Sequence, residues 1–461
     1  MVDRKLLIGG MIIADEILKA DLLIEGDKIS RIGHDLKKQM SDDCQIIDVS
    51  GKLIMPGIID AHTHYKLKSR DTVTADDFYT GSISAAFGGV TTFIDYADHL
   101  KDRTLKEAAE IRIKDADEES VLDFHFHQTI TEFDQTVSRE LEEIKELGIS
   151  SIKIFTTYQR EGYMIATEKW EQLFYRLKEL ELLVTVHAED DQLIRALEGE
   201  YRLRGQLSCK MHPEIRPAQA EALAIKKVGK LAQKIDMPLY IVHLSSDEGY
   251  QVLKDLKKMG GAIFGETTPH YLLLDQNYLL RPFPAKYLMT PPLRTIKDQQ
   301  ALWQGLKEND IQLVATDHCA FNLAQKGSGE NCIDIFPGIP GSETLLPLIH
   351  HFGKEEGLSY TRLVEVLAKN PARIFGLYPE KGSLKIGTDA DLIVFDPNKR
   401  VKLKNDNLHS RAEYSPYQEF EVKGYPVMTI LRGQIIVKDG KFLGNRGDGR
   451  FIKGDKSSLF I

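Results

Sequence analysis

Eight short apolar runs, separated by stretches with helical periodicity, occupy the middle of this 461-residue chain. Such alternation is typical of a parallel sheet built from strand-helix units. The runs cover residues 58–64, 90–97, 122–130, 151–155, 183–188, 239–245, 262–270 and 311–318. An open doubly wound sheet is the alternative, but no Gly-x-Gly-x-x-Gly turn follows the first run. The sequence therefore predicts an α/β protein with a (β/α)8 TIM-like barrel.

Between these runs, apolar residues recur at the three- and four-residue spacing of an amphipathic helix. We expect helices at 137–147, 168–181, 218–234, 249–259 and 295–309. Helices in these positions would cover the outside of the barrel.

Both ends of the chain are rich in short strands instead. We expect strands at 5–8, 20–25, 28–33, 391–395, 420–422 and 428–438. Either end alone would leave open sheet edges and half a core, so we predict one small β-sandwich domain built from both chain ends. The expected divisions are 1–53 for the N-terminal part of the sandwich, 54–378 for the barrel, and 379–461 for the C-terminal part and tail.

Charge and composition exclude several classes of partner. The net charge of −9 provides no basic surface for nucleic acid. No run approaches the roughly 20 apolar residues of a membrane-spanning helix, and the N-terminus does not resemble a signal peptide. The four cysteines lack the paired spacing of disulfide frameworks or zinc knuckles. We therefore expect a cytoplasmic protein that binds neither nucleic acid nor membranes.

His62-Thr63-His64 ends the first predicted strand. Residues two apart on a strand project from the same face, so the two imidazoles could bind one metal ion. In a barrel, functional side chains gather at the C-terminal ends of the strands. Other predicted strands end near Lys153, His187, His243 and Asp317. Singly, each could be a core or rim residue, but together they predict a metal centre.

Lys153 is the unusual member of this set, because an ammonium group beside a divalent ion would be both desolvated and repelled. One explanation is a neutral lysine. The other is carboxylation by carbon dioxide, which would convert the cation into an anionic ligand with two oxygens, able to bridge two metal ions.

Several ordered motifs resemble the metal-dependent amidohydrolases that act on cyclic amides. These are His62-Thr63-His64, Ser151-Ile152-Lys153-Ile154-Phe155, Thr185-Val186-His187-Ala188-Glu189, Ile241-Val242-His243-Leu244-Ser245 and Thr316-Asp317-His318-Cys319. Within that superfamily the chain is most similar to the dihydropyrimidinase and hydantoinase family. The motifs that indicate this are 72–81, 85–89, Tyr158 and Met289-Thr290-Pro291-Pro292-Leu293-Arg294.

The resemblance implies a binuclear centre with two divalent metal ions. His62 and His64 would bind the more buried ion and Asp317 would complete that site. The second ion would be bound by His187 and His243, and carboxylated Lys153 would bridge the two. The many imidazoles favour zinc, although manganese or cobalt could use the same ligands. The resemblance also implies a homotetramer, with residues 451–461 as a segment that could reach a neighbouring subunit.

The implied reaction is hydrolysis of the cyclic amide bond of dihydropyrimidines or 5-substituted hydantoins by a metal-bridged hydroxide, giving N-carbamoyl amino acids. Asp317 would transfer the proton to the leaving ring nitrogen. Tyr158 would donate a hydrogen bond to the developing oxyanion, although packing at the rim is the alternative role for this residue. Thr290 is a candidate backbone contact to the substrate.

Some positions depart from the family pattern and leave the substrate open. Pro337 stands where the family has an Asn whose backbone holds the substrate. Proline has no N–H, so this hydrogen bond is either lost or supplied by a neighbour such as Gly338. His270 and Lys66 suggest an allantoinase-like or dihydroorotase-like enzyme as alternatives, although Lys66 could also be a solvated loop charge.

A non-catalytic relative such as a collapsin response mediator protein is disfavoured, since all six ligand positions are intact. We expect His125 and His127 to be core residues or residues that support the ligands, and not ligands themselves.

Overall fold

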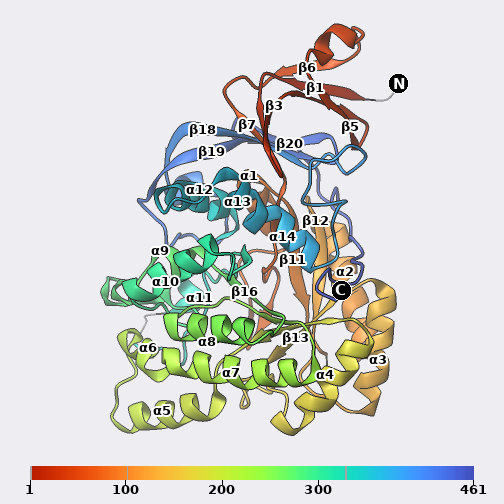
Figure 1. Cartoon of the computed structure of the whole chain (residues 1–461). Coiled ribbons are helices and arrows are strands. Elements are labelled where there is room, and N and C mark those ends of the chain that lie inside the picture. Colours follow the sequence, from red (N-terminus) through yellow and green to blue (C-terminus); the bar gives the residue numbers. More distant parts are fainter. Residues whose placement is uncertain (1–2, 101, 328–329, 461) are drawn as a thin grey trace.

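An eight-stranded parallel barrel forms the body of the protein (Figure 1). The computed structural model describes residues 3–100, 102–327 and 330–460. The barrel strands follow chain order: β8 (Ile58–Asp60), β11 (Val90–Ala97), β12 (Asp123–Thr129), β13 (Ser151–Phe155), β14 (Leu183–His187), β15 (Leu239–Ile241), β16 (Ile263–Thr267) and β17 (Leu313–Val314). The two ends meet where the His64 N–H donates to the His318 carbonyl at 2.8 Å. The predicted barrel is confirmed.

Several predicted strands are shorter than expected, and for two of them the difference shapes the site. The strands predicted over 239–245 and 311–318 end at Ile241 and Val314. Beyond them His243 and Asp317 adopt positive φ values of 37° and 50°, which an extended strand does not allow. The chain therefore turns at these two residues.

All five predicted helices are present, with small shifts at their ends. They are α3 (Gln135–Leu147), α4 (Trp170–Glu179) preceded by the 3₁₀ turn η2 (Thr167–Lys169), α7 (Ala218–Ile235), α8 (Asp247–Lys258) and α10 (Ile296–Lys307). Local sequence explains the ends of α3. The Asp134 carboxylate accepts from the N–H groups of Thr136 and Val137, and Gly148 ends the helix with φ 93°.

The remaining helices complete the shell and the loops. The α-helices are α1 (Phe78–Phe87), α2 (Leu105–Glu119), α5 (Asp191–Leu203), α6 (His212–Ile215), α9 (Pro269–Leu273), α11 (Leu323–Lys326), α12 (Leu345–Glu355), α13 (Tyr360–Val364) and α14 (Asn370–Ile374). Shorter turns are η1 (Leu36–Gln39), η3 (Cys209–Met211), η4 (Gln276–Leu280), η5 (Pro284–Tyr287), η6 (Ser342–Thr344), the π-helical turn η7 (Glu365–Lys369) and η8 (Asn405–Asn407).

A β-sandwich built from both chain ends lies above the barrel in Figure 1, as predicted. Its four-stranded sheet contains β5 (Lys28–Gly33), β4 (Asp21–Glu25), β1 (Arg4–Ile8) and β6 (Gln45–Asp48). Its seven-stranded sheet contains β21 (Lys441–Phe442), β20 (Gln434–Lys438), β19 (Glu421–Leu431), β18 (Leu392–Lys402), β7 (Leu53–Pro56), β2 (Met11–Ile13) and β3 (Ile17–Lys19). A small hairpin of β9 (Lys68–Ser69) and β10 (Thr72–Val73) lies in a barrel loop.

The seven-stranded sheet joins the two parts because both of its faces are buried. Ile54 and Val394 pack into the core of the sandwich, whereas Met55 and Ile393 pack into the large core shared with the barrel. This follows from the alternation of side chains along a strand. The exact domain boundaries at 53/54 and 378/379 stay a prediction.

The single strand predicted over 428–438 is wrong. The chain instead forms a hairpin between β19 and β20, because Arg432 and Gly433 both have positive φ values, 45° and 76°. Two consecutive residues of this kind are typical of a tight hairpin turn.

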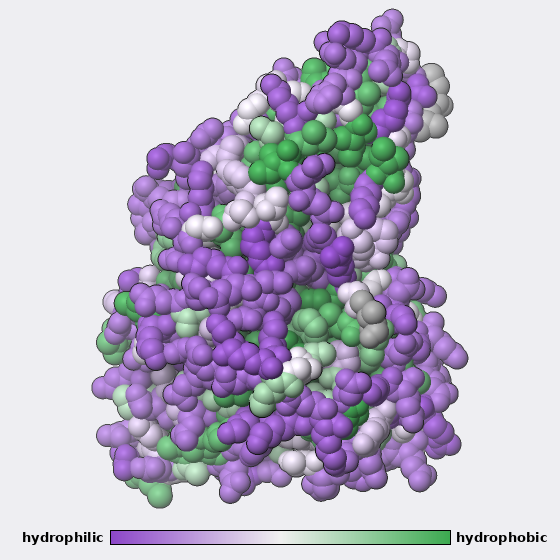
Figure 2. All heavy atoms as spheres, in the orientation of Figure 1, coloured by the Kyte–Doolittle hydropathy of each residue, from purple (hydrophilic) through white to green (hydrophobic). Residues whose placement is uncertain are grey.

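The C-terminal tail lies beside the barrel of the same chain (Figure 1). The Phe124 N–H in β12 donates to the Arg450 carbonyl at 3.0 Å, and the Ile452 N–H donates to the Phe124 carbonyl at 2.8 Å. Hydrophilic residues cover most of the face in Figure 2. Among the described residues, no helix has the length and apolar character needed to cross a membrane.

Candidate active site

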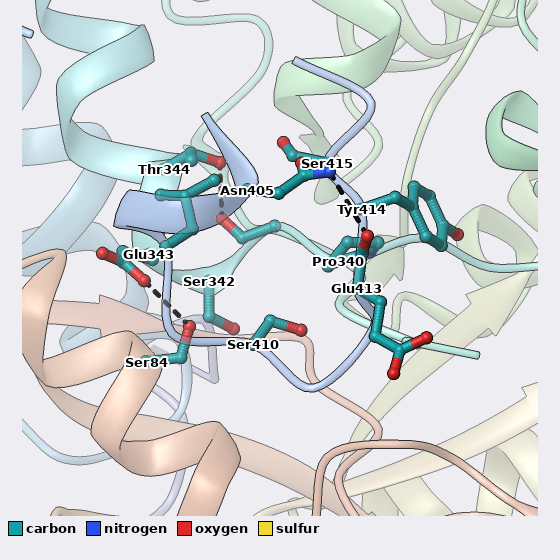
Figure 3. Close-up of a pocket in the computed structure, with 12 residues that line it drawn as sticks. Ser84, Pro340, Ser342, Glu343, Thr344, Asn405, Ser410, Glu413, Tyr414 and Ser415 are labelled. Atoms are coloured by element: carbon teal, nitrogen blue, oxygen red, sulfur yellow. Dashed lines mark hydrogen bonds between the residues drawn. The ribbon is translucent and has the colours of Figure 1, made fainter. Parts of the chain in front are cut away.

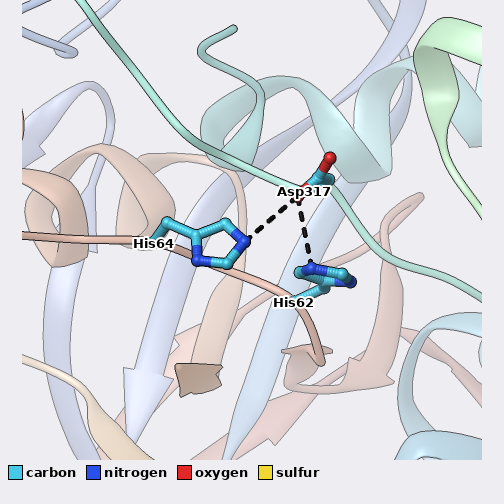
Figure 4. Close-up of side chains that lie close together, drawn as sticks. All are labelled: His62, His64 and Asp317. Carbon is cyan, nitrogen blue, oxygen red and sulfur yellow. Dashed lines mark ion pairs between the residues drawn. The ribbon is translucent and has the colours of Figure 1, made fainter. Parts of the chain in front are cut away.

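His62, His64 and Asp317 meet at the C-terminal end of the barrel (Figure 4). The two histidines follow β8 and Asp317 follows β17, at the seam where the barrel closes. One carboxylate oxygen of Asp317 lies 3.2 Å from Nε2 of His62 and 3.3 Å from Nε2 of His64. Two imidazole nitrogens and a carboxylate oxygen so close together could hold a metal ion.

His243 and His187 lie next to this cluster. The His243 ring lies 5.4 Å from the ring of His62 and 4.6 Å from the ring of His187. Burial lowers the pKa values of His62, His187 and His243 below the ordinary histidine value. The three imidazoles are therefore neutral at pH 7, which is the form that binds metal ions.

Lys153 lies in β13 and is buried. Its Nζ is 5.1 Å from the ring of Tyr96, and Tyr96 in turn packs against His62 and His64 at 4.9 and 4.7 Å. Burial lowers the pKa of Lys153 to about 7. A large share of neutral amine is thus present at neutral pH, and the neutral amine is the form that reacts with carbon dioxide.

The structure brings all six predicted ligand residues to one place, and the donor set fits divalent metal ions. It combines four imidazoles, one carboxylate and a lysine suited to carboxylation. Burial alone would raise the pKa of Asp317, but His62, His64 and His243 hold it far below its usual range. Asp317 is therefore ionised.

Glu266 in β16 supports this cluster and was missed from the sequence as a functional residue. Its Oε1 lies 2.7 Å from Nδ1 of His62, which leaves Nε2 of His62 facing Asp317. It also accepts from the Tyr240 hydroxyl at 2.8 Å and from the His243 N–H at 3.0 Å. Burial raises the pKa of Glu266 to about 8. An acidic residue inside an apolar predicted strand is the sequence signal that could have identified Glu266 as a functional residue.

Glu189 has the corresponding role at His187. Its Oε2 lies 2.8 Å from Nε2 of His187, so Nδ1 is the nitrogen left for a metal ion. Burial would raise the pKa of Glu189, but the Arg216 guanidinium, with Nη2 at 2.5 Å, and His187 hold it well below its usual range. Neither Glu189 nor Arg216 was predicted, since nothing in their spacing indicates this contact.

Tyr158 lies beside His187, with ring centroids 5.3 Å apart. Its backbone has φ 67°, a conformation uncommon for a residue with a side chain and frequent at functional sites. Burial raises the pKa of Tyr158 to about 12, so its hydroxyl stays protonated. The Thr290 side chain hydrogen-bonds that hydroxyl, which places two predicted substrate residues together.

Gly338 is placed differently from the other predicted substrate residues. Its N–H donates to the Leu288 carbonyl at 3.0 Å, so this donor is used within the loop. Its φ is 128°, and a Cβ atom there would collide with the Cys319 carbonyl oxygen. The turn therefore requires glycine for steric reasons.

Lys66 is paired away from the metal ligands. Its Nζ lies 2.8 Å from Glu119 and 3.3 Å from Asp115, both on α2. His125 and His127 are core residues, as expected: Nδ1 of His125 contacts the Ile452 carbonyl at 2.8 Å and Nδ1 of His127 contacts Ser151 at 2.6 Å.

A separate pocket lies between η6 and the loop before β19 (Figure 3). Glu343 in this pocket accepts hydrogen bonds from the Ser84 hydroxyl at 3.3 Å and the His409 N–H at 2.8 Å. The residues that line it include none of the predicted ligands.

A buried cluster of imidazoles and carboxylate at the C-terminal mouth of a (β/α)8 barrel is the arrangement of a metal-dependent hydrolase. The chain belongs to the amidohydrolase family, whose model matches residues 53–436. It is 36% identical over 459 residues to a D-phenylhydantoinase of Escherichia coli, a match that covers 98% of each chain.

Solved structures agree with this assignment. Dihydropyrimidinase from Brevibacillus agri superposes with a TM-score of 0.96 at 32% identity, covering 98% of this chain and 99% of that one. L-hydantoinase from Arthrobacter aurescens superposes with a TM-score of 0.88 at 26% identity, covering 98% of this chain and 100% of that one. The predicted resemblance to the hydantoinase and dihydropyrimidinase branch is confirmed.

Proposed function

We propose that this protein is a binuclear cyclic amidohydrolase that opens the ring of 5-substituted hydantoins or dihydropyrimidines, giving N-carbamoyl amino acids. The observation that carries this proposal is the meeting of His62, His64 and Asp317 beside His243 and His187, in a chain of the amidohydrolase family. The relatives named D-phenylhydantoinase and dihydropyrimidinase support the choice of ring.

The ligand assignment follows from which side chains lie together. His62, His64 and Asp317 would hold one ion, His187 and His243 the other, and carboxylated Lys153 would bridge them. Zinc is the ion we expect from a set rich in imidazoles. When bound, two such ions lower the pKa of a water molecule and polarise the amide carbonyl.

The protein's own groups then move the proton and hold the charge. Asp317 is ionised and can take a proton from the attacking water and pass it to the ring nitrogen. The protonated Tyr158 hydroxyl can donate to the oxyanion that develops on the carbonyl. Thr290 hydrogen-bonds that hydroxyl, which would orient it toward the substrate.

The alternatives for the ring are not favoured. Lys66 suggested an anionic ring substituent, as in dihydroorotate, but its ammonium is paired with Glu119 and Asp115 on α2. The Gly338 N–H is bonded to Leu288 and Pro337 has no N–H, so this turn supplies neither backbone donor to the substrate. We infer that Tyr158 and Thr290 hold the ring.

The test is a substrate panel combined with metal analysis. The purified protein should contain two divalent ions per chain and should open dihydrouracil or 5-substituted hydantoins faster than allantoin or dihydroorotate. Treatment with a chelator should abolish turnover, and added zinc should restore it. Preferred turnover of allantoin or dihydroorotate would overturn the choice of ring.

We further propose that the protein is a cytoplasmic homotetramer. The four cysteines are buried thiols, which fits a reducing compartment. Light scattering coupled to size exclusion measures the assembly directly, and a monomer would contradict it.

A further inference from the structure

Behind the proposed second metal site lies a buried ion pair between Arg216 and Glu189. The guanidinium contacts the carboxylate through two nitrogens: Nη2 lies 2.5 Å from Oε2, and Nε lies 3.2 Å from each carboxylate oxygen. Glu189 is fully buried and also contacts Nε2 of His187 at 2.8 Å. Without Arg216, the Glu189 charge would lose its only ion-pair partner among the described lysines and arginines.

The same guanidinium lies against the ring of Tyr158, 5.1 Å from its centroid. The Arg216 guanidinium therefore lies over the ring of the proposed oxyanion donor, while its nitrogens contact the carboxylate that supports His187. A planar guanidinium can do both at once, whereas a lysine ammonium lacks the flat surface and the two-pronged geometry.

The backbone of Arg216 is itself held by a hydrogen bond from Arg294, which also contacts Ser245 beyond the end of β15. The Arg216 carbonyl accepts from Arg294 at 2.5 Å, and Nε of Arg294 donates to the Ser245 hydroxyl at 3.1 Å. Ser245, two residues after His243, donates to the buried carboxylate of Glu221 at 2.9 Å. The support of His187 thus belongs to a continuous polar network that runs from Glu189 through Arg216, Arg294 and Ser245 to Glu221.

We propose that Arg216 is a positioning residue that couples the second metal site to the oxyanion donor. It fixes Glu189 so that His187 turns Nδ1 toward the metal, and it holds the Tyr158 ring at the same time. This inference rests on the proposed function and adds a residue to it. It predicts that one substitution impairs metal retention and kcat together.

The test compares Arg216→Lys with Arg176→Lys. Arg176 on α4 pairs with Glu142 and Glu179 and lies outside the network, so it is a matched control for the loss of a guanidinium. We expect Arg216→Lys to weaken binding of one of the two ions by about 10- to 100-fold, measured by metal analysis after graded chelation, and to lower kcat more than it changes KM. The control should retain both ions and its kcat.

A double-mutant cycle separates positioning from general stability. If Arg216 acts through Glu189, then Glu189→Gln should lose the same ion, and adding Arg216→Lys to it should cause little further loss of metal affinity. If the two substitutions instead lower metal affinity independently, so that their factors multiply in the double variant, the proposal is overturned. So would a folded Arg216→Lys protein with both ions and the parent kcat. If Arg216→Lys does not fold, Glu189→Gln still decides: retention of both ions overturns the proposal.

Failure of the proposed function gives a different result. In that case the parent protein itself would lack bound metal or would not open any ring of the panel. A parent with two ions and ring-opening activity, but with variants that resemble it, would reject only the role of Arg216.

Discussion

At the scale of single residues, burial sets the charge of the groups at the barrel mouth. It lowers the pKa of Lys153 to about 7 and raises that of Glu266 to about 8 and that of Tyr158 to about 12. Each shift favours the neutral form of the side chain. Asp317 is the exception, because three histidines surround its carboxylate and keep it ionised.

Substitution of the buried lysine tests the bridging role. We expect Lys153→Ala to lose metal and ring-opening activity, because the carboxylated side chain supplies the bridge. Short-chain carboxylic acids, which mimic the carbamate, should partly restore both. Lys326 is a matched control, since it is also buried with a pKa lowered to about 7 but donates to the Leu288 and Phe336 carbonyls. Lys326→Ala should retain its metal and show no response to the acids. An active, fully metallated Lys153→Ala protein without additives would disprove the bridge.

Removal of the Tyr158 hydroxyl tests the oxyanion donor. Tyr158→Phe should lower kcat by a factor that corresponds to about 3 kcal/mol, because the hydrogen bond to the oxyanion is lost. The metal content should stay unchanged, because Phe also loses the Thr290 hydrogen bond but no proposed metal ligand is altered. Tyr175→Phe on the exposed side of α4 serves as the control. If Tyr158 only packs at the rim, kcat would stay near the parent value.

At the scale of elements, the residues at and just beyond the strand ends shape the candidate active site more than the lengths of the strands do. His243, Asp317 and Tyr158 all have positive φ at or beyond a strand end, where the chain turns across the barrel mouth. Hydrophobic periodicity predicted the strands and the helices because it depends on neighbouring residues alone. It could not predict the turns at His243 and Asp317, which depend on packing against other strands.

The turn at Gly338 provides a test at this scale. Gly338→Ala should reduce stability by about 1–3 kcal/mol, because the residue has φ 128° and a Cβ would collide with the Cys319 carbonyl. Chemical denaturation measures the loss. Gly205 also has positive φ, 64°, but no atom lies within 4 Å of the position that a Cβ would take there, so Gly205→Ala should cost less. Equal losses at the two sites would show that the collision is unimportant.

At the scale of the whole molecule, buried ion pairs link the sandwich to the barrel. The Lys381 ammonium is buried and lies 2.5 Å from Asp123 in β12, 2.9 Å from Asp389 and 2.6 Å from Asp391. Arg432, from the sandwich hairpin, pairs with Asp123 as well. Lys28 also pairs with Asp389, at 2.8 Å. Three cations of the chain therefore face these three carboxylates, whereas no lysine or arginine among the described residues forms an ion pair with Asp317 at the His62 cluster.

Lys381→Met should therefore destabilise the whole protein. Removing one partner leaves buried carboxylates without compensation, a loss of about 3–5 kcal/mol. Equilibrium denaturation should show it for both parts of the molecule, since the seven-stranded sheet shares a core with the barrel. Lys114→Met, on an exposed side chain of α2, should change little. A Lys381→Met protein as stable as that control would refute the structural role.

The barrel, the two-ended sandwich and the six candidate ligands could all be predicted from the amino-acid sequence. Local periodicity defines strands and helices, and the C-terminal ends of parallel strands converge at one mouth, so residues such as His62 and Asp317 could be expected to meet. The residues that support these ligands became apparent only from the folded chain. Glu266 is 204 positions from His62, and Arg216 is 27 positions from Glu189. The fold likewise places the Lys66 ammonium against α2 and uses the Gly338 N–H within its own loop. These contacts depend on how distant segments pack, and no local pattern of residues encodes such distances.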